Sequence, residues 1–78
     1  MTDALDIEIS NHLARLGVVP LLGGLIPEPV TAVLLGYAPS YLRRLAADGL
    51  APLPFVRRGN RRFYKVSDIR LFMTKTVE

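Results

Sequence analysis

Apolar residues recur at helical spacing near the start of the chain and predict an amphipathic helix over residues 3–16. The positions on its apolar face are Leu5, Ile9, Leu13 and Leu16. Residues 17–27 are also strongly apolar, but Gly and Pro interrupt them, so neither a helix nor a strand is predicted there. Two interpretations of this segment stay open: a connector packed over the core, or a contact surface between copies of the chain.

Two short helices joined by a tight turn are predicted next, over residues 28–35 and 39–48. Pro29 suits the first turn of the first helix, and Gly36 provides the positive backbone angle that ends it. A turn this short sets the two helices at a steep angle, as in a helix-turn-helix. The second helix has an apolar stripe that would seat it on the core: Leu42, Leu45 and Ala46.

A hairpin of two basic strands, residues 55–58 and 61–66, follows the second helix. Gly59-Asn60 is its two-residue loop, because Gly accepts the backbone angles of the first loop position. A last helix is predicted to begin with Ser67 as its cap and Asp68 in its first turn. The pattern as a whole indicates a mostly α-helical chain with a small β-hairpin.

The loop sets the register of the hairpin and thereby brings arginines together. Val56 pairs with Phe63 on one face, and Arg57 pairs with Arg62 on the other. Like charges directly opposite each other destabilise a hairpin unless an anion lies between them, so four arginines around one tip indicate phosphate contact. Aromatic residues on a basic strand can stack on unpaired bases. Phe63 and Tyr64 instead follow the core-facing pattern, and at least one of them is predicted to be buried.

Half of the 78 residues are apolar, more than the core of so small a domain needs. The surplus indicates that another copy of the chain covers some apolar surface. The chain has no cysteine and a single histidine, His12, which has no second ligand near it in the sequence. We therefore expect no metal, no cofactor and no small-molecule ligand. Because no nucleophile–base set or phosphate-binding glycine motif is present, we expect no enzyme.

Charge is distributed unevenly, although the formal net charge is only +3. Residues 1–36 carry one base against four acids, a net of −3, whereas residues 37–78 carry nine bases against three acids, a net of +6. A basic carboxyl half predicts a polyanionic partner. The apolar stretch 13–36 contains charges and prolines that a membrane helix would not tolerate, and no signal peptide is recognisable, so we expect a cytoplasmic protein without a membrane partner.

Three short segments follow one another at fixed spacing: Leu34-Leu35-Gly36, Pro39-Ser40-Tyr41-Leu42-Arg43-Arg44-Leu45 and Asp48-Gly49-Leu50. Together they resemble the helix-turn-helix of the MerR superfamily, whose excisionase and AlpA-like members are the closest in size. Residues 62–69 are similar to the wing signature of that superfamily: an Arg, two aromatics, a gap of three, then Asp and an aliphatic residue. The resemblance covers about residues 28–73. Ala38 departs from it, since the family usually has a capping Ser there, a loss of about 1 kcal/mol.

The resemblance implies a winged helix-turn-helix, to which the apolar pattern of residues 3–16 adds an extra amino-terminal helix. Residues 1–27 would form that helix and the apolar connector, and residues 28–78 the DNA-binding domain. It further implies a recombination directionality factor of bacterial or phage origin. Such a factor binds adjacent sites on double-stranded DNA through self-association, bends the DNA, and assists an integrase in excising a phage or mobile element. No counterpart of residues 1–27 occurs in the shortest members, so the resemblance assigns them no role.

The candidate DNA-binding residues lie on the second helix of the helix-turn-helix and on the wing. Those on the helix are Ser40, Tyr41, Arg43 and Arg44, and those on the wing are Arg57, Arg58, Asn60, Arg61, Arg62 and Lys65. A guanidinium group matches the two acceptors of guanine, so Arg43 and Arg44 are the candidates for base readout, and which of them reads bases stays open. The wing residues are expected to bind phosphates.

Two alternatives to a directionality factor stay open. One is a transcriptional repressor of the same fold with no integrase partner. The other is a protein-interaction antiactivator that uses the apolar segment 17–27. Duplex binding through several phosphates would weaken steeply with salt, whereas binding to a protein through apolar surface would not.

Overall fold

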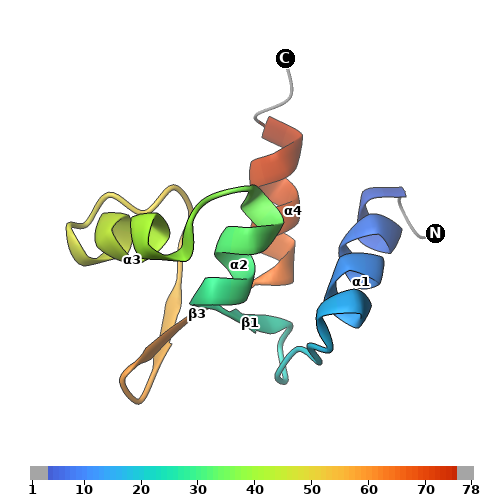
Figure 1. Ribbon diagram of the computed structural model, residues 1–78, viewed down its shortest axis with the longest axis horizontal. Helices are drawn as coiled ribbons and strands as arrows, with labels where there is room; N and C mark the ends of the chain where they lie inside the picture. The colour runs from blue at the N-terminus through green and yellow to red at the C-terminus, as the bar shows by residue number, and fades with distance from the viewer. Residues whose placement is uncertain (1–3, 76–78) are drawn as a thin grey trace.

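The computed structural model describes residues 4–75, which form four helices and a three-stranded antiparallel sheet (Figure 1). The helices are α1 (Ala4–Leu16), α2 (Glu28–Leu35), α3 (Pro39–Ala47) and α4 (Val66–Lys75). The strands are β1 (Leu25–Pro27), β2 (Val56–Arg58) and β3 (Arg61–Lys65). The predicted helices and hairpin are therefore present, and the sheet has one strand more than the sequence pattern predicts. None of the helices in this part of the chain has the length and hydropathy that a membrane span needs.

The additional strand, β1, lies in the segment for which the pattern predicts no element. It pairs antiparallel with β3, with Ile26 opposite Tyr64, so the strand order is β1-β3-β2 and β3 is central. Three residues are too few to show an alternating pattern, and Pro27 is tolerated because β1 is an edge strand. The pairing ties the end of the amino-terminal segment to the inner strand of the hairpin.

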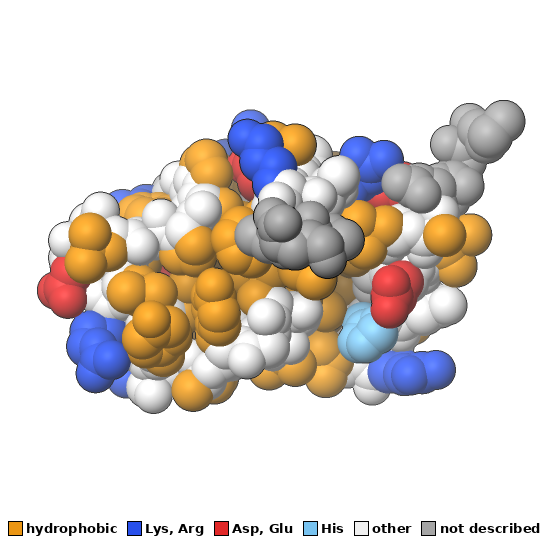
Figure 2. All heavy atoms as spheres, turned by 90° about the horizontal axis from the view of Figure 1, so that it is seen from above, with side chains coloured by type: hydrophobic (Ala, Val, Ile, Leu, Met, Phe, Trp, Pro, Cys, Tyr) orange, Lys and Arg blue, Asp and Glu red, His pale blue; other side chains and the backbone are white. Residues whose placement is uncertain are grey.

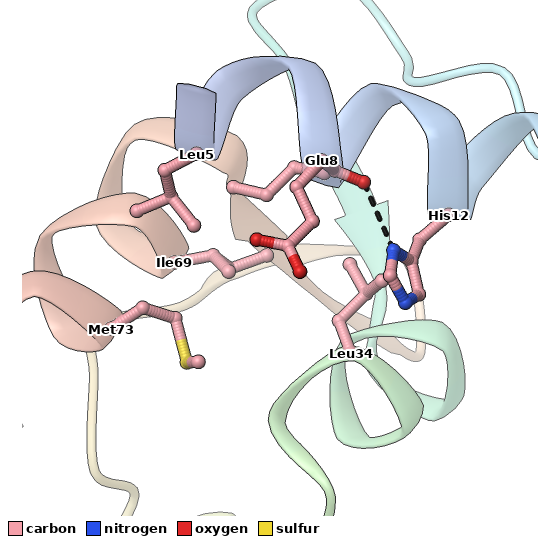
Figure 3. A pocket seen from close by; sticks show the side chains of 7 residues that line it. Leu5, Glu8, His12, Leu34, Ile69 and Met73 are labelled. Carbon is pink, nitrogen blue, oxygen red and sulfur yellow. Dashed lines mark hydrogen bonds between the residues drawn. The ribbon is translucent and has the colours of Figure 1, made fainter. Parts of the chain in front are cut away.

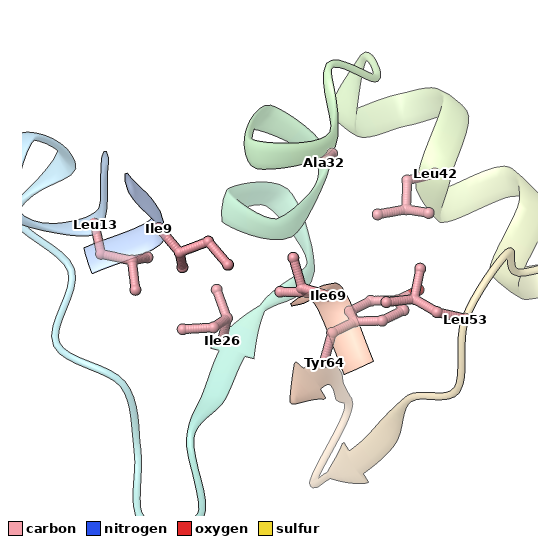
Figure 4. Close-up of a cluster of buried hydrophobic side chains, with 8 residues drawn as sticks. All are labelled: Ile9, Leu13, Ile26, Ala32, Leu42, Leu53, Tyr64 and Ile69. Carbon is pink, nitrogen blue, oxygen red and sulfur yellow. The ribbon is translucent and has the colours of Figure 1, made fainter. Parts of the chain in front are cut away.

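A single buried cluster holds the elements together (Figure 4). Its members come from α1, β1, α2, α3, β3, α4 and the segment before β2: Ile9, Leu13, Ile26, Ala32, Leu42, Leu53, Tyr64 and Ile69. The predicted apolar face of α1 thus packs on the same core as α2 and α3, except that Leu16 is exposed. The start predicted for this helix, residue 3, lies outside the described residues.

The connection between α2 and α3 has the predicted geometry. Gly36 ends α2 with φ of 83°, in the left-handed region that favours glycine. Ala38 precedes α3 in an extended conformation and offers no side-chain acceptor to the first turn. Within α3, Leu42 and Ala46 are buried and Leu45 is half-buried, as the apolar stripe predicts.

The hairpin register is confirmed: Val56 lies opposite Phe63, and Arg57 lies opposite Arg62. Phe63 and Tyr64 are both buried, although adjacent residues of a strand point to opposite faces. The prediction that Ser67 caps α4 is wrong. The helix begins one residue earlier, at Val66, because β3 leads into it directly and the Val66 N–H donates to the Gly24 carbonyl at 2.8 Å.

Candidate nucleic-acid interface

The face of α3 opposite its buried stripe carries the four residues expected to contact DNA. Ser40, Tyr41, Arg43 and Arg44 are all exposed. The Arg44 guanidinium lies over the Tyr41 ring at 5.5 Å from its centroid, and the Tyr37 ring meets Tyr41 edge-on. The two arginines therefore have different surroundings: Arg44 lies along an aromatic ring of its own helix, whereas Arg43 faces the hairpin.

The tip of the hairpin presents three exposed arginines and an asparagine: Arg57, Arg58, Asn60 and Arg61. Its loop is a two-residue turn in which Gly59 has φ of 63° and Asn60 does not have a positive φ. This combination is the one expected of a turn with Gly in the first loop position. Lys65 is exposed as well, but it lies at the opposite end of β3 from the tip, where it pairs with Leu25 of β1.

Arg62 differs from the other arginines of the hairpin, because its side chain is only 18% exposed. One of its terminal nitrogens lies 3.4 Å from a carboxylate oxygen of Glu28, and its guanidinium lies 5.5 Å from the centroid of the Phe55 ring. Its Nε is buried without a hydrogen-bond partner among the described residues. The charge that faces Arg57 across the hairpin thus has a counter-ion within the protein, and the register alone does not require a phosphate there.

Glu28 is the residue at this site that the sequence pattern misses. It is the first residue of α2, where the helix dipole favours a negative charge, and it is buried. Its second carboxylate oxygen accepts a hydrogen bond of 2.9 Å from the hydroxyl of Tyr64, which is fully buried. One feature of the sequence points to this site: Arg62 and Tyr64 are two residues apart and therefore share one face of β3. Together the three side chains join α2 to the central strand.

Burial raises the pKa of the Tyr64 hydroxyl well above its ordinary value of 10.0, and the adjacent Glu28 carboxylate raises this pKa further. The folded protein therefore holds the Tyr64 proton above pH 10, where the unfolded chain releases it. Stability from this group is complete below pH 10 and is lost as the pH rises beyond it. We expect the free energy of unfolding to fall between pH 10 and 12 more steeply in the wild type than in Tyr64→Phe, by at most ~1.4 kcal/mol per pH unit. Urea titrations at several pH values measure both slopes, and equal slopes would contradict the assignment.

The exposed face of α3 and the hairpin tip meet around one hollow. It has a volume of about 330 Å³ and is lined by Arg43 of α3, by Asn60, Arg61 and Arg62 of the hairpin, and by residues 27–30 at the start of α2. Three arginines thus line the hollow, and Glu28 is the one acidic residue in its lining. Figure 1 shows α3 and the hairpin together at one end of the molecule and α1 at the other end.

The described residues contain no group of three His, Cys, Asp or Glu side chains that could hold a metal ion. Arg43, Asn60, Arg61 and Arg62 give the hollow cationic and amide donors, which suit an anionic partner. Comparison of the chain with protein-family models, with curated proteins and with solved structures gives no match.

Proposed function

We propose that the protein binds double-stranded DNA sequence-specifically as a winged helix-turn-helix, with α3 in the major groove and the β2–β3 hairpin as the wing. The observation that carries the proposal is the hollow at which Arg43 meets Asn60 and Arg61. A recognition helix and a wing have to reach the same stretch of duplex, and these two elements present their basic residues to one side of the molecule. Residues 37–78, which include both elements, carry a net charge of +6.

The two elements have different tasks in this proposal. Ser40 and Arg43 lie in the first half of α3 and are assigned to base edges, because residues near the amino end of a recognition helix reach the bases. Arg44 is placed by the Tyr41 ring at the flank of the helix and is assigned to a phosphate. The exposed residues of the tip are assigned to phosphates: Arg57, Arg58, Asn60 and Arg61. Arg62 supports the wing through Glu28.

Within this class, the proposed role is that of a recombination directionality factor that assists an integrase. The support is the resemblance of residues 28–73 to the excisionase and AlpA-like branch of the MerR superfamily. A single module of this kind buries roughly 600–1,000 Å² of its own surface on DNA, which favours binding by several copies on adjacent sites. Loss of the gene is expected to block excision of its element; loss of repression at a neighbouring promoter alone would favour the repressor.

Selection of binding sites from random duplexes tests the DNA-binding proposal. Arg43→Ala is expected to relax the preference at one base position, at a cost of about 1–3 kcal/mol for the preferred sequence. Arg61→Ala is expected to lower the affinity for all sequences alike, since it removes a phosphate contact. Arg15→Ala, which removes an exposed arginine on α1, is the matched control and is expected to change neither property. Equal effects of all three substitutions would contradict the assigned interface.

A further inference from the structure

The loop between α1 and β1, residues 17–24, holds apolar side chains out in water. Leu22 is 97% exposed and Val19 is 85% exposed. The backbone of the loop is nevertheless fixed, because the Leu21 N–H donates to the Leu25 carbonyl at 3.0 Å and the Gly24 N–H donates to the Leu21 carbonyl at 2.9 Å. A tight turn thus keeps Leu22 projecting at its tip. Monomeric proteins expose single apolar residues often, but seldom in a rigid group of this kind.

A second apolar feature lies between α1, α2 and α4 (Figure 3). It is a hollow of about 110 Å³ whose apolar lining is Leu5, Ile9, Leu34, Ile69 and Met73. Glu8 and His12 of α1 complete the lining, and the His12 ring bonds to the backbone carbonyl of Glu8. For comparison, an apolar cavity of ~150 Å³ accommodates a benzene-sized guest. The hollow therefore matches one branched aliphatic side chain.

The surface on this side of the molecule is also apolar. Figure 2 looks from above on the structure of Figure 1, in which the hairpin points downward, and shows hydrophobic side chains gathered across the middle of the face with charged ones around them. This side therefore lies away from the hairpin tip. An apolar contact there leaves Arg43 and Arg61 of the copy that provides the hollow open to a different partner.

We propose that Leu22 of one copy inserts into the α1–α2–α4 hollow of the next copy. The occupant is a second copy because the same chain carries both the projecting leucine and a hollow of its size. Charge complementarity supports the pairing: Lys65, exposed beside the end of the loop, carries the charge opposite to that of Glu8 at the hollow. The two surfaces are different, so the contact is head-to-tail and can continue from copy to copy instead of closing into a two-fold dimer.

The contact does not depend on DNA, so its test is separate from that of DNA binding. Sedimentation equilibrium of the full chain without DNA is expected to show a mass that rises with concentration. Leu22→Asp removes the projecting apolar group, and His12→Trp places an indole at the hollow. Each substitution is expected to weaken the association by about tenfold or more, since burial of one leucine contributes that much. Leu71→Asp, at an exposed position of α4 outside both surfaces, is the control and is expected to associate like the wild type.

An equimolar mixture of Leu22→Asp and His12→Trp provides the sharper test. The first variant keeps its hollow and the second keeps its leucine, so the mixture is expected to form a dimer that does not grow further. This result also shows that both variants are folded. The proposal is overturned if the wild type stays monomeric at every concentration, which would leave the loop to a different partner. It is also overturned if His12→Trp associates like the wild type, or if the mixture stays monomeric.

Discussion

Replacing Glu28 with alanine is expected to lower the free energy of unfolding by about 3–5 kcal/mol. The substitution leaves the largely buried guanidinium of Arg62 without its counter-ion and the hydroxyl of Tyr64 without an acceptor. Removal of one partner of a buried pair costs far more than the pair contributes, because the remaining charge stays desolvated. A chain of 78 residues has a total stability of only about 4–12 kcal/mol. Urea unfolding followed by circular dichroism measures the loss.

Two further variants separate the charge of Glu28 from its hydrogen bond. Tyr64→Phe removes only the hydroxyl and is expected to cost about 1–2 kcal/mol. The double replacement of Glu28 and Arg62 by methionine removes both charges and is expected to recover most of the stability that Glu28→Ala loses. If Glu28→Ala unfolds within about 1 kcal/mol of the wild type, the network does not hold α2 to β3.

The affinity for duplex DNA is expected to fall about 10²–10³-fold between 50 and 200 mM salt. Each phosphate that a lysine or arginine neutralises releases counterions and adds about −0.9 to the log–log slope. The five exposed arginines of the proposed interface therefore give a slope of about −4.5; they are Arg43, Arg44, Arg57, Arg58 and Arg61. Fluorescence anisotropy with a labelled duplex at several salt concentrations measures it.

Variants of Arg62 and Arg61 test whether the salt dependence arises from the interface that the structure shows. Because Glu28 already neutralises its guanidinium, joint replacement of the two residues by methionine is expected to leave the slope unchanged. Arg61→Ala, one position earlier on the same strand, is expected to reduce the magnitude of the slope by about 0.9. A slope near zero in the wild type would instead favour the protein-interaction alternative. A slope that changes on the joint replacement would show that Arg62 reaches the DNA.

Local signals were sufficient to predict most of the fold. Pro29 and Gly36 delimit α2 through backbone preferences that need no tertiary contact. Gly59-Asn60 fixes the register of the hairpin in the same way. β1 could not be predicted, because its three residues, of which the last is Pro27, form a strand only when β3 is beside them. The start of α4 was misplaced by one residue for a similar reason: the Val66 N–H finds its acceptor in the chain before β1.

The residues of the candidate site likewise fall into two groups: those that local sequence patterns predict and those that depend on tertiary packing. The exposed positions of α3 follow from helical periodicity, and those of the hairpin tip from its register. The pairing of Arg62 with Glu28 joins residues that are 34 positions apart, so no local pattern identifies Glu28 as the partner of this arginine. In the sequence, nothing separates Glu28 from the other acids of the amino-terminal half. Its buried role follows only from the packing of α2 against β3.

Because β3 is the central strand, the placement of the hairpin depends on a late step of folding. β1 and β3 come together only after a long loop has closed, which is a slow step compared with the growth of a helix. α3 can form early from local interactions, but the hairpin gains its fixed place only when β3 has paired with β1. Without this closure the hairpin arginines would have no fixed place relative to α3, so the proposed DNA-binding surface is complete only in the fully folded chain.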